Sequence, residues 1–171
     1  MAITFEKIWD AYDTGNPYVD KKTGAPPKGY ENQCAIRVGL ALEKAGVSFV
    51  NCPAKRVPGA PKSSGMVPSA QALANWLKTK PFAGCPEVQS YNGKSVFDEI
   101  SGRSGIIFLA NYWQRSAETD SERRSGDHID LWNGRRLTKL FSWFRVHWGI
   151  HWDGTFSDFR LADKALFWHI P

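Results

Sequence analysis

Apolar residues in the first half of the chain recur at helical spacing in three places. Positions three and four apart are apolar over residues 4–12, which predicts a short amphipathic helix. Residues 35–45 predict a mostly buried helix, with Asn32 as its N-cap and Gly46 where it stops. A further helix is predicted over residues 70–80. The N-terminal half is therefore expected to be helical.

Two irregular segments separate these helices. Residues 13–30 are rich in Gly, Pro and Lys and are predicted to form a loop. Residues 51–69 contain four prolines and two glycines, and we expect a surface loop that flanks a groove. Ser69 at its end is a suitable cap for the next helix, and Pro81 is expected to end that helix.

The second half of the chain has the signature of strands. The run IIFLANYW over residues 106–113 predicts a buried strand. Polar and apolar residues alternate from His128, and Asn133-Gly134 is the strongest short hairpin signal in the chain. Residues 165–171 predict a last strand. Helices followed by antiparallel strands indicate an α+β fold, which we expect to form one domain over residues 1–171.

Composition and charge narrow the classes of function. The chain has 171 residues, of which 42% are hydrophobic, as in soluble globular domains. Its net charge of +5 favours polyanionic partners, but the sequence has no zinc-finger spacing and no RNA-binding signature, so we expect no nucleic acid. No segment is long enough to insert into a membrane. Lys7 and Asp10 interrupt the N-terminal apolar residues, which predicts a cytoplasmic protein or export without a cleaved leader.

Cys34 is the first candidate for chemistry, because it lies directly after the predicted helix cap. A helix start and a nearby imidazolium both lower the pKa of a thiol and so favour the nucleophilic thiolate. The alternative is that Cys34 packs in the core, as most isolated cysteines do. Cys52 and Cys85 lie in proline-flanked loops and are expected to be structural, with a disulfide between them as the alternative.

His128 is the candidate general base, and Asp130 is its candidate partner. Residues two apart on a strand share a face, so the Asp130 carboxylate is expected to orient the His128 ring. The alternative is the polar, solvent-facing side of an edge strand. His147 and His151 stand four apart, a spacing that suits a metal, but we favour aromatic packing and expect no metal site. His169 is expected to be structural.

Two further residues near the thiol are candidates for substrate binding. Arg37 lies one helical turn after Cys34, where it would stabilise the thiolate or bind a substrate carboxylate. The alternative for Arg37 is a buried strut that donates to backbone carbonyls. We expect a cleft between helix and sheet, and Tyr30 is expected to line it.

Three stretches together carry a resemblance to a known family. They are GYENQCAIRVGLALEKAGV over residues 29–47, GDHIDLWNG over residues 126–134, and the Phe-Trp-hydrophobic-Pro ending. In this order they resemble the fourth family of type VI secretion amidase effectors, which are papain-like cysteine peptidases related to the NlpC group. The resemblance implies an enzyme that cuts the bond between D-glutamate and meso-diaminopimelate in peptidoglycan stem peptides, without a cofactor.

The resemblance also implies roles for individual residues. Cys34 would be the nucleophile and His128 the general base, with the nucleophile at a helix start packed on an antiparallel sheet. The oxyanion would be held by backbone N–H groups at that helix start, with Gln33 as an additional side-chain donor. The family's acidic residue is expected just after the Asn-Gly turn, where this chain has Lys139. We therefore predict Asp130 as the third catalytic residue, with Thr138 as the alternative.

The biological setting follows from the same resemblance. The protein would be exported from the cytoplasm by the type VI secretion apparatus, would act in the periplasm of target Gram-negative cells, and would be neutralised by a dedicated immunity protein. A competing hypothesis is a non-catalytic domain that binds cell wall or protein through an aromatic groove in its Trp-rich C-terminal half.

Overall fold

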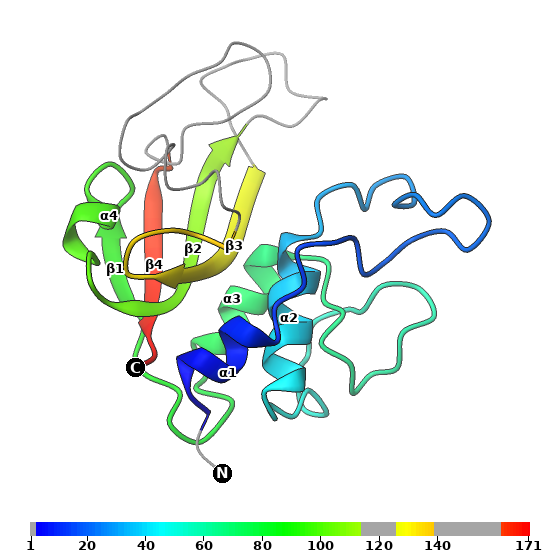
Figure 1. Cartoon of the computed structure of the whole chain (residues 1–171), viewed down its shortest axis with the longest axis horizontal. Helices are drawn as coiled ribbons and strands as arrows, with labels where there is room; N and C mark the ends of the chain where they lie inside the picture. Colours follow the sequence, from blue (N-terminus) through cyan, green and yellow to red (C-terminus); the bar gives the residue numbers. More distant parts are fainter. Residues whose placement is uncertain (1–2, 114–125, 139–161) are drawn as a thin grey trace. The chain divides into compact units, whose positions relative to one another are not determined.

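The computed structural model describes residues 3–113, 126–138 and 162–171. The chain divides into two compact units, Met1–Pro86 and Glu87–Pro171. The first unit contains helices joined by long irregular segments, and the second contains an antiparallel sheet with one short helix (Figure 1). The predicted α+β class is confirmed, whereas one domain over residues 1–171 stays a prediction.

The N-terminal unit has its three helices in the predicted segments, although the third ends at Leu77, before the predicted stop at Pro81. The predicted cap Ser69 forms, since its hydroxyl accepts from the N–H of Ala72 at 3.1 Å. A cap that was not predicted forms at Thr4, whose hydroxyl accepts from the N–H of Lys7 at 3.5 Å. Each cap satisfies a backbone donor that the helix itself cannot pair. The helices are α1 (Phe5–Asp10), α2 (Cys34–Lys44) and α3 (Ala70–Leu77).

The start of α2 differs by one residue from the prediction. Its N-cap is Gln33, not Asn32, and the Gln33 side chain makes no capping hydrogen bond. Asn32 still takes part, because its side-chain oxygen accepts from the N–H of Cys34 at 3.3 Å. At the other end Gly46 adopts φ +105°, a left-handed conformation that ends helices and that glycine tolerates best.

The predicted loop over residues 51–69 has no regular secondary structure, yet it is firmly attached to the rest of the unit. The Glu43 carboxylate on α2 accepts from the N–H of Gly65 at 2.7 Å. A Cβ on Gly39 would lie 2.0 Å from the Gly65 carbonyl oxygen, so the two backbones touch where only glycine fits. Arg56 donates to the backbone carbonyls of four residues, which are Phe49, Ala54, Lys62 and Ser64.

The C-terminal unit is built on a sheet with strand order β1-β4-β2-β3 in the residues that the structure describes. All three neighbouring pairs are antiparallel, and the strand order places β3 at one edge. The predicted strands correspond to β2, β3 and β4, whereas β1 and the short helix α4 were missed. The elements are β1 (Gln89–Asn92), α4 (Val96–Glu99), β2 (Ser104–Trp113), β3 (Gly126–Asn133) and β4 (Lys164–His169).

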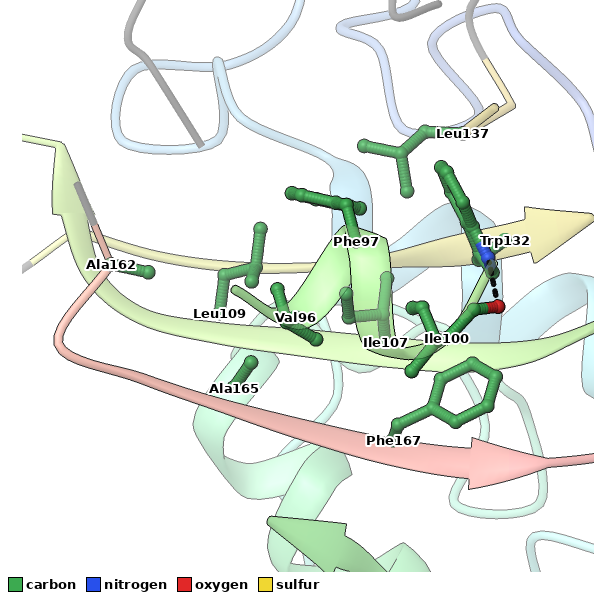
Figure 2. Packing of buried hydrophobic residues seen from close by; sticks show 10 residues of the cluster. All are labelled: Val96, Phe97, Ile100, Ile107, Leu109, Trp132, Leu137, Ala162, Ala165 and Phe167. Carbon is green, nitrogen blue, oxygen red and sulfur yellow. Dashed lines mark hydrogen bonds between the residues drawn. The ribbon is translucent and has the colours of Figure 1, made fainter. Parts of the chain in front are cut away.

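A buried cluster joins α4 to one face of this sheet. Figure 2 shows Phe97 of α4 packed near Trp132 of β3, with ring centroids 5.2 Å apart. The Trp132 indole N–H donates to the Ile100 carbonyl at 3.2 Å, so the buried polar atom is satisfied. The opposite face is also buried, at Ile106 and Ile129 among others. This double burial explains why β2 carries an uninterrupted apolar run over residues 106–110.

No helix among the described residues has the length and apolar character needed to cross a membrane.

Candidate functional site

His128 and Asp130 meet on the edge strand β3. The two residues lie opposite Leu109 and Ile107 of β2, and both project from the same face of the sheet. His128 Nε2 is 3.4 Å from Asp130 Oδ2. The contact between imidazole and carboxylate that the sequence predicted is therefore present in the structure.

The Asp130 carboxylate is held by two further donors. Its Oδ1 accepts from the N–H of Leu131 at 2.8 Å and from the hydroxyl of Thr138 at 2.6 Å. Asp130 and Thr138 are both buried. Because Oδ1 is occupied by these donors, Oδ2 is directed at the imidazole. Thr138, which the sequence offered as an alternative to Asp130, instead supports it.

A tight turn brings Thr138 back to the strand. The Asn133 side-chain oxygen accepts from the N–H groups of Arg135 and Arg136, at 3.1 and 2.9 Å. Gly134 in this turn has φ +89°, which glycine accommodates without strain. A bridge between Trp132 and Leu137 closes the turn, as the Asn-Gly pair predicted.

This geometry defines the chemistry open to the imidazole. The His128 side chain is 14% exposed, and its Nδ1 atom is buried. With Nε2 donating to Asp130, Nδ1 is the ring nitrogen that a proton from a thiol or substrate would reach. The buried carboxylate would stabilise the imidazolium after that proton arrives.

Cys34 is the first residue of α2, in the N-terminal unit. It is 4% exposed, and the eleven-residue helix that follows presents its positive end at this position. None of the three cysteines forms a disulfide, so the alternative of a Cys52–Cys85 bridge is absent from this structure.

The residue before Cys34 fastens a distant segment to the start of α2. Gln33 is fully buried, and its side-chain amide pairs with the backbone of Tyr18 in both directions. The amide NH2 donates to the Tyr18 carbonyl at 2.6 Å, and the amide oxygen accepts from the Tyr18 N–H at 2.9 Å. Its proposed role as an oxyanion donor stays a prediction, and only its second N–H would be available for it.

Arg37 acts on the same segment. Its Nε donates to the Gly15 carbonyl at 2.6 Å, and one terminal nitrogen donates to the Asn16 side chain at 2.9 Å. This is the strut arrangement that the sequence left open beside a direct role in catalysis. Tyr30 is half-buried and packs edge-to-face on Tyr18, with centroids 5.0 Å apart. No sequence signal pointed to Tyr18, because its contacts come from residues fifteen and twelve positions later.

A negative charge precedes the thiol by three residues. The N–H of Gly29 donates to the Glu31 carboxylate at 3.0 Å, and this hydrogen bond lowers the pKa of Glu31 below its usual value. Glu31 is therefore ionised at neutral pH and opposes formation of a thiolate at Cys34. Because Glu31 is exposed, water screens this effect.

The remaining candidates fall into two groups. His169 is held by the Ser104 carbonyl at 3.0 Å and stacks on Phe167, as expected of a structural residue. Lys139, His147 and His151 lie outside the described residues. Within the described ranges, no group of three His, Cys, Asp or Glu side chains is arranged to hold a metal ion.

The structure thus brings the predicted residues together in two sets. His128, Asp130 and Thr138 form one set, in the C-terminal unit. Cys34, Gln33 and Arg37 belong to the other, at the start of α2 in the N-terminal unit.

Known structures share this fold over the full chain. The effector Tae4 from Salmonella typhimurium, solved with the immunity protein Tai4 from Enterobacter cloacae, matches with a TM-score of 0.64 and 19% identity, covering 99% of this chain and 100% of that one. Tae4 from Enterobacter cloacae matches with a TM-score of 0.60 and 16% identity, covering 100% of this chain and 98% of that one. At such identities the likeness shows the fold, which is the predicted papain-like, NlpC-type one.

The sequence itself supplies the assignment to a family. No curated protein matches it significantly. The family model described as "Type VI secretion system (T6SS), amidase effector protein 4" matches residues 30–168, which include Cys34, His128 and Asp130. That match spans most of the chain and favours the enzyme over a non-catalytic binding domain. The chain therefore belongs to the type VI secretion amidase effector 4 family, whose members are antibacterial peptidoglycan amidases.

Proposed function

We propose that the protein hydrolyses the bond between D-glutamate and meso-diaminopimelate in peptidoglycan stem peptides, through a thioester on Cys34. One observation carries the assignment of residues. His128 Nε2 faces a buried Asp130 carboxylate whose other oxygen is occupied by Thr138 and Leu131. A carboxylate fixed in this way serves to orient an imidazole, and an oriented imidazole serves as a general base.

The first step is formation of the thiolate. The Cys34 thiol transfers its proton to Nδ1 of His128, and the imidazolium that results is stabilised by Asp130 at Nε2. The thiolate gains from its position at the first residue of α2, where the helix has its positive end. Asp130 keeps its charge throughout and takes no proton.

Acylation and deacylation follow. The thiolate attacks the γ-carbonyl carbon of D-glutamate, and N–H groups of the first turn of α2 hold the oxyanion, since no carbonyl within the helix pairs with them. The C–N bond breaks as His128 returns its proton to the amine of meso-diaminopimelate. His128 then takes a proton from water, the hydroxide attacks the thioester, and the glutamate carboxylate leaves while the thiol is restored.

The site of action and the inhibitory partner belong to the same proposal. A type VI effector is delivered into a neighbouring cell, and the stem peptides of Gram-negative cells lie in the periplasm. Two similar structures, one with Tae4 from Salmonella typhimurium and one from Enterobacter cloacae, are complexes of Tae4 with the immunity protein Tai4. We propose that this chain is likewise neutralised by a dedicated immunity protein of the producing cell.

The test uses purified protein and Gram-negative peptidoglycan, with the released muropeptides identified by mass spectrometry. The wild type is expected to separate D-glutamate from meso-diaminopimelate. Cys34→Ala and His128→Ala should each lose at least about a thousandfold in rate, because nucleophile and base act as a unit. Cys52→Ala is the cysteine control and should retain activity.

Retained cleavage in Cys34→Ala or in His128→Ala would refute the assignment of residues. Cleavage at a different bond by the wild type would refute the proposed specificity.

A further inference from the structure

A pocket lies in the N-terminal unit, beyond the C-terminal end of α2. Its volume is about 470 Å³. Its lining combines an indole ring and two proline rings with hydroxyl and amide side chains. The lining residues are Ser48, Asn51, Pro53, Trp76, Thr79 and Pro81.

The apolar wall of this pocket is rigidly supported. Trp76 is buried to 5% exposure and packs on Phe49 with ring centroids 4.5 Å apart. The Arg56 guanidinium lies 5.8 Å from the Phe49 ring centroid, and the same guanidinium donates to four backbone carbonyls. These contacts hold the indole in place before any ligand arrives, so binding would cost little conformational entropy.

The polar rim is held in an unusual backbone conformation. Lys80, between Thr79 and Pro81, has φ +53°, a region that side chains other than glycine rarely adopt. Strain of this kind persists where the surrounding structure enforces it, and it often accompanies binding sites. Ser48 and Asn51 on the same rim are exposed, so their polar groups face solvent and are open to a ligand.

The sequence around the pocket carries only positive charges. Residues 44–86 contain six lysines and arginines and no aspartate or glutamate. Lys55 and Lys78, each within two positions of a lining residue, are exposed. A pocket in such a segment attracts ligands that carry carboxylates.

The pocket is separate from the proposed nucleophile. Cys34 is the first residue of α2, whereas Ser48 follows the last turn of the same helix. Eleven helical residues span about 16 Å, so a ligand in the pocket lies roughly that far from the thiol.

We propose that this pocket is an accessory subsite that binds a carboxylate-bearing sugar–peptide unit of peptidoglycan and so holds the enzyme on the polymer. The proposal rests on the function proposed above. The rings of Pro53 and Pro81, backed by the buried indole, suit the apolar face of a sugar or peptide. The hydroxyl and amide groups suit its polar edges, and the lysines suit the free carboxylates of a stem peptide.

Binding is tested with the inactive Cys34→Ala protein and insoluble peptidoglycan that is pelleted by centrifugation. The added double change Lys55→Gln with Lys78→Gln should weaken binding about three- to tenfold, since each exposed charge contributes modestly. Lys94→Gln with Lys164→Gln removes the same charge from exposed positions of the C-terminal unit and should leave binding unchanged. Equal loss in both pairs would show a general charge effect and would overturn the proposal.

A second measurement uses the active protein. Ser48→Phe places a bulky ring in the pocket from an exposed rim position, so the fold should tolerate it. Its rate on insoluble peptidoglycan should fall severalfold, while kcat/KM on an isolated soluble stem tetrapeptide stays at the wild-type value. Unchanged rates on both substrates would overturn the subsite and leave the proposed function intact. Failure of the wild type on the soluble peptide would instead count against the proposed function.

Competition identifies the ligand. The isolated stem tetrapeptide should displace the inactive protein from peptidoglycan, and more so at low salt, because the lysines act through charge. Displacement only by a neutral oligomer of N-acetylglucosamine would overturn the acidic character that we assign to the ligand.

Discussion

The two halves of the proposed catalytic site are built in different ways. On β3, the residues His128, Asp130 and Thr138 lie within eleven positions of one another, and a strand followed by a tight turn brings them together. At the start of α2, Gln33 and Arg37 instead hold residues that lie 15 to 22 positions earlier in the chain. The first half is local in the sequence and the second is not.

Because of this difference, substitutions in the two halves should have different effects. Changes on β3 should alter the protonation and orientation of one imidazole while the fold remains. Changes at the start of α2 should release a long segment and therefore act first on stability. Single substitutions in each half can test that division.

Asp130→Asn should lower kcat by about 10³- to 10⁴-fold with little loss of stability. The side-chain oxygen can still accept from Thr138 and Leu131, but the amide NH2 then faces His128 Nε2. The imidazole must accept there and carry its proton on Nδ1, which is the wrong tautomer for a base. Steady-state kinetics and thermal unfolding measure the two quantities.

The control for this change is Thr138→Val, which keeps the charge of Asp130 and removes one donor to it. It should cost about tenfold in kcat, in line with about 1.5 kcal/mol for a hydrogen bond to a charged group. A wild-type rate in Asp130→Asn would move the orienting role to another residue.

Arg37→Ala should lower the free energy of unfolding by about 3 kcal/mol, because two charge-assisted hydrogen bonds to residues 15 and 16 are lost. For a chain of this length the melting temperature should fall by about 6 to 12 °C. Differential scanning calorimetry provides the measurement. Arg135→Ala, at an exposed position of the turn after β3, is the matched control and should change stability by less than about 0.5 kcal/mol.

An Arg37→Ala protein with wild-type stability but a greatly reduced rate would contradict the strut. It would favour instead the direct role beside the thiol that the sequence left open.

Glu31→Gln should have the smallest effect. It removes an ionised carboxylate three residues before Cys34, so the pKa of the thiol should fall and alkylation at neutral pH should speed up by less than about twofold. The pH dependence of the alkylation rate of Cys34 shows the shift. Asp20→Gln is the control, because its carboxylate also has a lowered pKa, from the N–H groups of Thr23 and Lys22, but lies farther along the loop. A slower reaction in Glu31→Gln would reverse the sign that we expect.

The elements that were predicted from sequence share a physical origin. Apolar spacing placed α1, α2 and α3, and alternation with an Asn-Gly pair placed β3 and its turn, because these signals depend on residues only a few positions apart. The strand β1 was missed because its residues are mostly exposed and carry no apolar alternation. It is defined instead by pairing with β4, more than seventy positions later.

In the candidate site, too, local contacts could be predicted and long-range contacts could not. The His128–Asp130 contact could be predicted, since a strand places every second side chain on one face. The N-cap of α2 was misplaced by one residue because Asn32 has the better capping propensity, whereas the buried pairing of Gln33 with Tyr18 is a tertiary contact. The support of Asp130 by Thr138 depends on how the chain returns after the turn at Asn133.

Four features could be inferred from the sequence alone: the α+β class, a thiol at a helix start, an imidazole and a carboxylate on one strand face, and the family. All of these depend on local spacing or on short contiguous sequence motifs. Three features emerge only from the folded chain: Gln33 and Arg37 hold residues 15–18, Thr138 supports Asp130, and a pocket follows the end of α2. Those outcomes depend on which distant groups reach one another as the chain packs, and a one-dimensional pattern does not record that.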